Sequence, residues 1–145
     1  MPRTQRLLPI LIVVVGVLVA GCGQGAADAP AAEPAVVEHV EGSDVARVTL
    51  TDEAVERIGI ETAPVTAGTG GRTVVPVATV LYDASGQAWV YTNPEGHVYL
   101  RAPVSIVDIR SGSAVLSTGP ASDTPVVTVG AAELYGTELG VGDPE

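Results

Sequence analysis

The sequence lacks lysine and phenylalanine, and it holds one cysteine and one methionine. A single cysteine excludes a disulfide within the chain. The chain has seven arginines and 17 acidic residues, so its formal net charge is −10. Because nucleic-acid binding needs a basic surface that displaces counterions from phosphates, this charge argues against a nucleic-acid partner. The only methionine is Met1, so the chain has no methionine-rich surface for soft metals such as copper.

Motifs that would place a nucleophile beside a base are also absent, because no serine stands in a G-x-S-x-G or S-x-x-K context. His39 lies beside acidic residues in a polar segment that fixes no ligand geometry, and His97 stands next to a turn. A surface or structurally bonded histidine is favoured over a metal ligand at His97. We therefore predict a protein that is not an enzyme and that has no metal site and no cofactor.

The N-terminal stretch has the pattern of a secretory signal. Arg3 and Arg6 precede an apolar run from Leu7 to Ala20, and small residues then lead to Cys22. The run is short for a membrane span, which needs roughly 17–25 apolar residues. The segment Val19-Ala20-Gly21-Cys22 resembles a bacterial lipobox, in which the cysteine receives diacylglycerol. The resemblance predicts a signal peptide over 1–21, lipidation at Cys22 and a membrane-anchored chain on the extracytoplasmic face; the alternative is an uncleaved signal anchor.

Residues 22–44 are rich in alanine and glycine and carry acidic residues without a basic one. Such a segment buries too little apolar surface to offset its conformational entropy, so we expect a disordered acidic tether. The folded domain is expected over 45–135, and residues 136–145 are expected to be a flexible tail.

The segment from Val74 to Leu134 is built from short runs rich in valine, isoleucine, threonine and tyrosine, which favour strands. The runs are separated by turn-forming clusters at residues 84–86, 93–96, 111–112 and 119–120. Ahead of this segment, residues 45–50 alternate as a strand, and Thr51 is placed to cap one short helix that ends at Gly59. The sequence therefore predicts a mainly β fold, a small antiparallel barrel or sandwich with one short helix.

Aromatic residues in this segment allow two interpretations. Trp89 and Tyr91 alternate along one strand and share a face, and Tyr99 can join them across a hairpin. Packing in the core is the favoured interpretation in a domain without phenylalanine. If the face is exposed, it is a candidate partner-contact surface. Arg101 and Arg110 flank a strand and are candidates to pair with acidic residues of a partner, or to be solvated.

Four stretches carry a resemblance to a known family. They are VTLTDEAVERIGIETAPV, VVPVATVLYDASGQAWVYTN, YLRAPVSIVDIRSGSAVLSTG and PVVTVGAAELYGTELG. Together they resemble the membrane-proximal domain of periplasmic adaptor subunits, or membrane fusion proteins, of RND-type efflux systems. The long helical hairpin and lipoyl-like domain of those proteins have no counterpart here, because Val65 meets Arg72 through a short loop and no heptad pattern exists.

The resemblance implies an accessory lipoprotein of an efflux transporter, which acts by contact with a cytoplasmic-membrane permease. A homo-oligomer is a further assembly that the sequence leaves open. The alternative is a stand-alone lipoprotein that binds a small molecule or metal, which would require a concave pocket with converging polar groups. Without the hairpin, we expect the protein to contact the exporter and not an outer-membrane channel.

Overall fold

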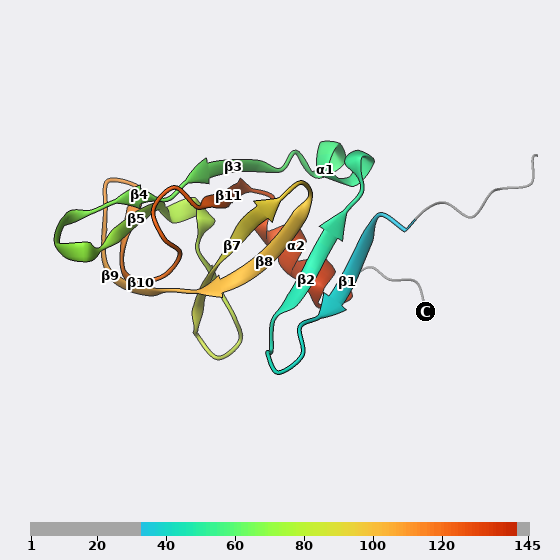
Figure 1. Cartoon of the computed structure of the whole chain (residues 1–145), viewed down its shortest axis with the longest axis horizontal. Coiled ribbons are helices and arrows are strands. Elements are labelled where there is room, and N and C mark those ends of the chain that lie inside the picture. The colour runs from blue at the N-terminus through green and yellow to red at the C-terminus, as the bar shows by residue number, and fades with distance from the viewer. Residues whose placement is uncertain (1–32, 142–145) are drawn as a thin grey trace, which may run out of the picture. The chain divides into compact units, whose positions relative to one another are not determined.

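The computed structural model describes residues 33–141 (Figure 1). Outside these residues lie the expected signal peptide, Cys22 and the first part of the expected tether. The end of the expected tail also lies outside them. Within residues 33–141, no helix has the length and apolar character needed to cross a membrane.

Two antiparallel sheets make up the described part of the chain. The larger has seven strands in the order β1-β2-β8-β7-β11-β3, with β6 paired to β7, and the smaller has the order β4-β5-β10-β9. The larger sheet is formed by β1 (Ala35–His39), β2 (Ala46–Leu50), β3 (Glu61–Pro64), β6 (Leu81–Tyr82), β7 (Ala88–Glu95), β8 (Val98–Pro103) and β11 (Pro125–Val129). The smaller is formed by β4 (Thr66–Ala67), β5 (Thr73–Pro76), β9 (Ser105–Arg110) and β10 (Ser113–Thr118).

Two α-helices, α1 (Asp52–Ile58) and α2 (Ala131–Glu138), and two 3₁₀ turns, η1 (Thr69–Gly71) and η2 (Val77–Thr79), complete the fold. Helix α1 begins where the sequence predicts, because the Thr51 side chain accepts a hydrogen bond from the Ala54 N–H at 3.2 Å. It ends at Gly59, whose backbone is left-handed with φ 71°. Local capping signals therefore determine both ends of this helix.

The core consists of two clusters, one on each side of the larger sheet. The first gathers side chains from β2, β7, β8 and β11 with both helices, and Figure 1 shows α2 crossing behind β7 and β8. The second joins the larger sheet to the smaller one through β5, β7, β10 and β11. Alternation along the strands divides neighbours between the clusters: Val90 and Val126 belong to the second, and Tyr91 and Val127 to the first.

The prediction of a mainly β, antiparallel fold is confirmed. Both sheets are open, so they do not close into a barrel, and there are two short α-helices in residues 33–141 where one was expected. The turn at Ser111-Gly112 is a tight hairpin with positive φ at both residues, 50° and 75°. At residues 93–96 the expected break is shorter, since β7 continues through Glu95.

Two expected boundaries need correction. Residues 35–39, placed in the disordered tether by their acidic and alanine-rich context, form β1 and pair with β2 over five residues. This pairing satisfies the backbone of a segment that has little intrinsic reason to order. The expected flexible tail is helical as far as Glu138, because α2 packs Ala131 and Leu134 into the first cluster.

Candidate functional site

A buried arginine lies where β7, β8 and α2 meet. Arg101 on β8 stands directly opposite Tyr91 on β7. Its Nε lies 2.7 Å from Glu138 Oε2 and its Nη2 lies 2.8 Å from Glu138 Oε1, so the two side chains form a two-pronged ion pair. Only 9% of the Arg101 side chain and 4% of the Glu138 side chain are exposed. The pair is thus almost removed from water, where its charges are costly unless matched.

Two aromatic rings flank the guanidinium of Arg101. Its Cζ lies 4.6 Å from the ring centroid of Trp89 and 5.3 Å from that of Tyr135. Both distances are within the range of cation–π attraction, in which the negative face of a ring stabilises the cation. We call Arg101, Glu138, Tyr91, Trp89 and Tyr135 together the arginine cluster. It joins a strand pair to the last turn of α2.

Two further donors bond to the Glu138 carboxylate. The Tyr91 hydroxyl donates to Oε2, and the Ala46 N–H on β2 donates to Oε1 at 3.2 Å. Burial and then the hydrogen bond to Glu138 raise the pKa of Tyr91, which keeps its hydroxyl protonated. Burial opposes the charge of Arg101, yet the hydrogen bonds and charge of Glu138 outweigh it and raise the pKa of Arg101. The cluster therefore holds a cation on Arg101 and a neutral phenol on Tyr91, both bonded to Glu138.

The candidate partner-contact residues from the sequence lie in different parts of the structure. Trp89, Tyr91 and Arg101 come together in the arginine cluster, whereas Tyr99 is 2% exposed and lies in the first core cluster. Tyr91, Tyr99 and Arg101 thus leave the expected contact surface, because burial gives a partner no access to them. Arg110 is 71% exposed and lies 3.1 Å from Asp108, which makes it a solvated ion pair at the surface.

Sequence reasoning missed Glu138 and Tyr135. Tyr135 closes the expected domain without an assigned role, and Glu138 falls in the expected tail, residues 136–145. A signal was present: Ala131, Leu134, Tyr135 and Glu138 follow the i, i+3, i+4, i+7 spacing of one helix face. Gly130 carries no capping side chain, and Gly136 interrupts the pattern, so the helix signal is weak. The partner of Arg101 is 37 residues away and has no local signature.

A second polar arrangement surrounds Asp83, which the sequence predicts as a turn residue. Its carboxylate accepts hydrogen bonds from the Ser85 hydroxyl at 2.6 Å, the Trp89 Nε1–H at 2.9 Å and the backbone N–H groups of Ser85 and Gln87. The bonds from Ser85 and then Trp89 lower the pKa of Asp83 to about 2. The turn therefore holds one edge of the Trp89 ring in place.

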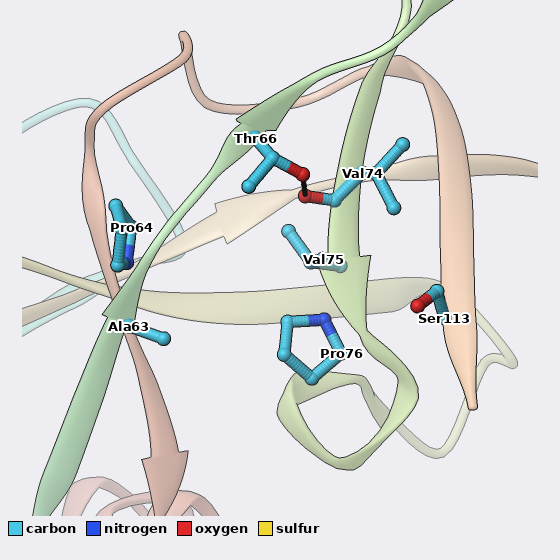
Figure 2. A pocket seen from close by; sticks show the side chains of 7 residues that line it. All are labelled: Ala63, Pro64, Thr66, Val74, Val75, Pro76 and Ser113. Carbon is cyan, nitrogen blue, oxygen red and sulfur yellow. Dashed lines mark hydrogen bonds between the residues drawn. The ribbon is translucent and has the colours of Figure 1, made fainter.

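An open pocket of about 310 Å³ lies between the two sheets (Figure 2). Its lining is Ala63, Pro64, Thr66, Val74, Val75, Pro76 and Ser113. No charged side chain contributes to this lining, and the Thr66 hydroxyl already donates to the Val74 carbonyl at 3.2 Å, as Figure 2 shows. A site that recognises a small molecule brings several polar groups to bear on it. This pocket offers mainly aliphatic surface.

The two histidines lie apart from both arrangements. His97 Nδ1 lies 3.1 Å from Asp52 Oδ1, with 39% and 87% of the two side chains exposed, so this pair is a surface contact near the start of α1. His39 is the exposed last residue of β1. Over residues 33–141, no three side chains among histidine, cysteine, aspartate and glutamate gather as metal ligands would.

Comparisons of the chain with protein-family models, with curated proteins and with solved structures find no match. The resemblance to periplasmic adaptor subunits therefore stays a prediction from the sequence. What the chain does has to be argued from its own residues.

Proposed function

We propose that the protein is a membrane-anchored accessory lipoprotein of an efflux transporter, which acts by protein contact outside the cytoplasmic membrane. One observation carries the proposal: three ionisable side chains of the arginine cluster, Arg101, Glu138 and Tyr91, bond to one another. A catalytic or ligand-binding site keeps such groups free toward a substrate. Here they fix α2 to the sheet, which favours a rigid body whose surface carries the function.

The anchor part of the proposal depends on Cys22 in its lipobox-like context. Two acyl chains on this residue hold a protein stably at a bilayer, where one chain alone binds marginally. A chain of this kind would stay next to the membrane that houses the permease. The formal net charge of the full sequence is −10, and an acidic chain is repelled by anionic headgroups, which leaves the domain free to contact protein.

The alternative, a stand-alone lipoprotein for a small molecule, has one observation in its favour, the pocket between the sheets. Its volume of about 310 Å³ is at the lower limit for a ligand pocket. Aliphatic lining with few polar groups gives little selectivity, so we rank this function second. Binding of a fluorescent apolar dye that is abolished by Val74→Asp, and left intact by Val129→Asp, would favour it.

Co-purification tests the proposed function directly. The tagged full chain is extracted in mild detergent, and the proteins recovered with it are identified. Repeated recovery of one polytopic permease is the expected result, and repeated recovery of the lipoprotein alone would contradict the proposal. Labelling with palmitate tests the anchor: we expect label on the unchanged chain and none on Cys22→Ser, with the variant released from the membrane.

A photo-crosslinking amino acid locates the contact surface. Tyr82 is 59% exposed on β6, close to the turn of Asp83, whereas Tyr99 is 2% exposed. Placed at residue 82 or at other exposed sites, the probe should capture the permease from at least one position. Placed at residue 99 it serves as the matched buried control. Capture from residue 99 at the same yield would indicate nonspecific labelling.

A further inference from the structure

Strand β9 (Ser105–Arg110) forms an outer edge of the smaller sheet. One side of it pairs with β10, and among residues 33–141 no strand pairs with its other side. Edge strands are usually protected by proline, charged side chains, β-bulges or a covering segment, since their free N–H and C=O groups can pair with another chain. β9 contains no proline; it carries the charges of Asp108 and Arg110 and a bulge at Val107. Val107 and Ile109 on it are 49% and 53% exposed.

The charges of β9 are arranged so that the strand complements itself. In an antiparallel pair, opposed residues lie on the same face of the sheet. Two identical strands related by a two-fold axis therefore place one residue opposite itself. If that residue is Ile109, Asp108 of each copy stands opposite Arg110 of the other. A two-fold axis at Asp108 would place the Asp108 carboxylates of the two copies opposite each other. An axis at Val107 would place Asp108 of one copy opposite the apolar Ile106 of the other.

We propose that β9 pairs antiparallel with β9 of a second copy of this chain, about a two-fold axis at Ile109. The existing Asp108–Arg110 ion pair, with its 3.1 Å contact, then becomes half of a four-charge square in which the signs alternate. The two Ile109 side chains meet on the opposite face. Ile109 is opposite Ala114, a fully buried residue of the second core cluster, so the pairing continues that apolar face across the axis.

The length of the pairing is limited by a bulge. Val107 has no partner opposite it in β10, because the register moves from Asp108 directly to Ile106. Beyond Arg110 the chain enters the hairpin turn at Ser111. Regular pairing therefore covers Asp108, Ile109 and Arg110, and the dimer is expected to be weak and concentration-dependent.

β1, one edge strand of the larger sheet, lacks this complementarity. Val36 and Val37 on it are 50% and 36% exposed. A two-fold axis at Val37 would place the Glu38 carboxylate opposite Val36, and an axis at Glu38 would oppose two carboxylates. The charge pattern thus favours β9 over β1. The inference does not depend on the lipid anchor or on an exporter, so its failure would leave the proposed function untouched.

Cysteine cross-linking tests the register. The full chain in detergent carries either Ile109→Cys or Val107→Cys, two positions of closely similar exposure, and the unchanged chain gives the background from Cys22. At the proposed axis two Cys side chains face each other within disulfide reach, whereas two at residue 107 lie four residues apart along the strands. We expect oxidation to link I109C at least tenfold faster than V107C. Equal rates, or no link above background, would overturn the proposal.

Charge exchange tests the pairing without a cysteine. Asp108→Arg alone sets arginine against arginine, and Arg110→Asp alone sets aspartate against aspartate, so each should weaken self-association, measured by sedimentation equilibrium, roughly tenfold. Mixing the two variants restores opposite charges across the axis, and the mixture should associate like the unchanged chain. The double variant D108R/R110D should do the same alone. Single variants that associate as tightly as the unchanged chain would refute the pairing.

Discussion

Gly130 is the residue at which the backbone most needs a glycine. It precedes α2 with φ +90°, and a Cβ there would lie 2.4 Å from Ile60 Cδ1 and 2.8 Å from Ile58 Cγ2. Left-handed backbone costs a residue with a side chain about 1–2 kcal/mol, and crowding adds to it. We predict that Gly130→Ala lowers the free energy of unfolding by about 2–3 kcal/mol, measured by urea denaturation with circular dichroism.

A matched control separates strain from crowding. Gly86 has φ +84°, but a Cβ on this residue would meet no atom within 4 Å. Gly86→Ala should therefore cost only the backbone term, about 1 kcal/mol. If the two substitutions have the same effect, the isoleucine contacts at Gly130 have no energetic role.

Asp83 gives a residue-level prediction in acid. Its pKa is held at about 2 by hydrogen bonds from Ser85 and Trp89, below the value near 3.9 of an unfolded chain. A lowered pKa means that the folded state favours the carboxylate, so this stabilisation is present above about pH 4 and is lost as pH falls toward 2. Asp83→Asn should be less stable at pH 6 and should lose less stability between pH 4 and 2. Thermal unfolding across this range measures it; parallel curves for the two proteins would contradict the assignment.

At the scale of elements, α2 is held by a contact that opposes its local preference. Glu138 stands in the last turn, where a negative charge is unfavourable with the helix dipole, and that turn has no basic residue. The bidentate ion pair with Arg101 stabilises the Glu138 charge in this position. We predict that Glu138→Ala, which leaves the Arg101 cation buried without a counter-charge, destabilises the protein by about 3 kcal/mol. Urea denaturation followed by the fluorescence of Trp89, the only tryptophan, measures the loss.

Two further variants check the cause. Glu133 lies exposed on the same helix, so Glu133→Ala should change stability by less than about 1 kcal/mol. The double variant Arg101→Met with Glu138→Met removes both charges and fills similar volume. It should be more stable than Glu138→Ala, since an apolar replacement avoids an unpaired buried charge. If the double variant is the least stable of the three, the charges themselves hold α2 in place.

The two helices show what the sequence could and could not predict. Helix α1 has local signals at both ends, Thr51 and Gly59, and the structure places it there. Helix α2 begins at Gly130 without a side-chain cap, and its stability comes from Ala131, Leu134 and Glu138 docking onto distant strands. The spacing of these residues is a weak helix signal, and it does not identify the distant strands onto which they dock. The strand β1 was missed for the same reason, because pairing with β2 orders a segment whose composition suggests disorder.

At the scale of the whole molecule, the sequence predicted which residues are site candidates. It did not predict which of them lie together in space. Alternation correctly put Trp89 and Tyr91 on one face of a strand. It could not show that a glutamate 37 positions beyond Arg101 would bury that face. The candidate contact surface is instead the place where α2 packs on β7 and β8.

Two buried tyrosines, Tyr91 in the arginine cluster and Tyr99 in the first core cluster, are expected to make the whole fold sensitive to alkali. Burial raises the pKa of both Tyr91 and Tyr99 above their ordinary value near 10. A raised pKa means that the folded state favours the protonated phenol, so the stabilisation is complete below pH 10 and is lost as pH rises above it. We predict that the free energy of unfolding falls as pH rises above about 10, measured by urea denaturation. Tyr91 should contribute about 1.4 kcal/mol per pH unit while the pH lies between its unfolded and folded pKa.

Substitution of single tyrosines tests this origin of the alkaline instability. Tyr91→Phe should lower stability at pH 7 by about 1 kcal/mol, because a hydrogen bond to Glu138 is lost. The same variant should reduce the alkaline slope, since the Tyr91 phenol no longer has a proton to lose. Tyr82→Phe, at a residue 59% exposed, is the matched control and should leave the slope unchanged. An equal effect of the two substitutions would show that burial of Tyr91 does not cause the loss of stability in alkali.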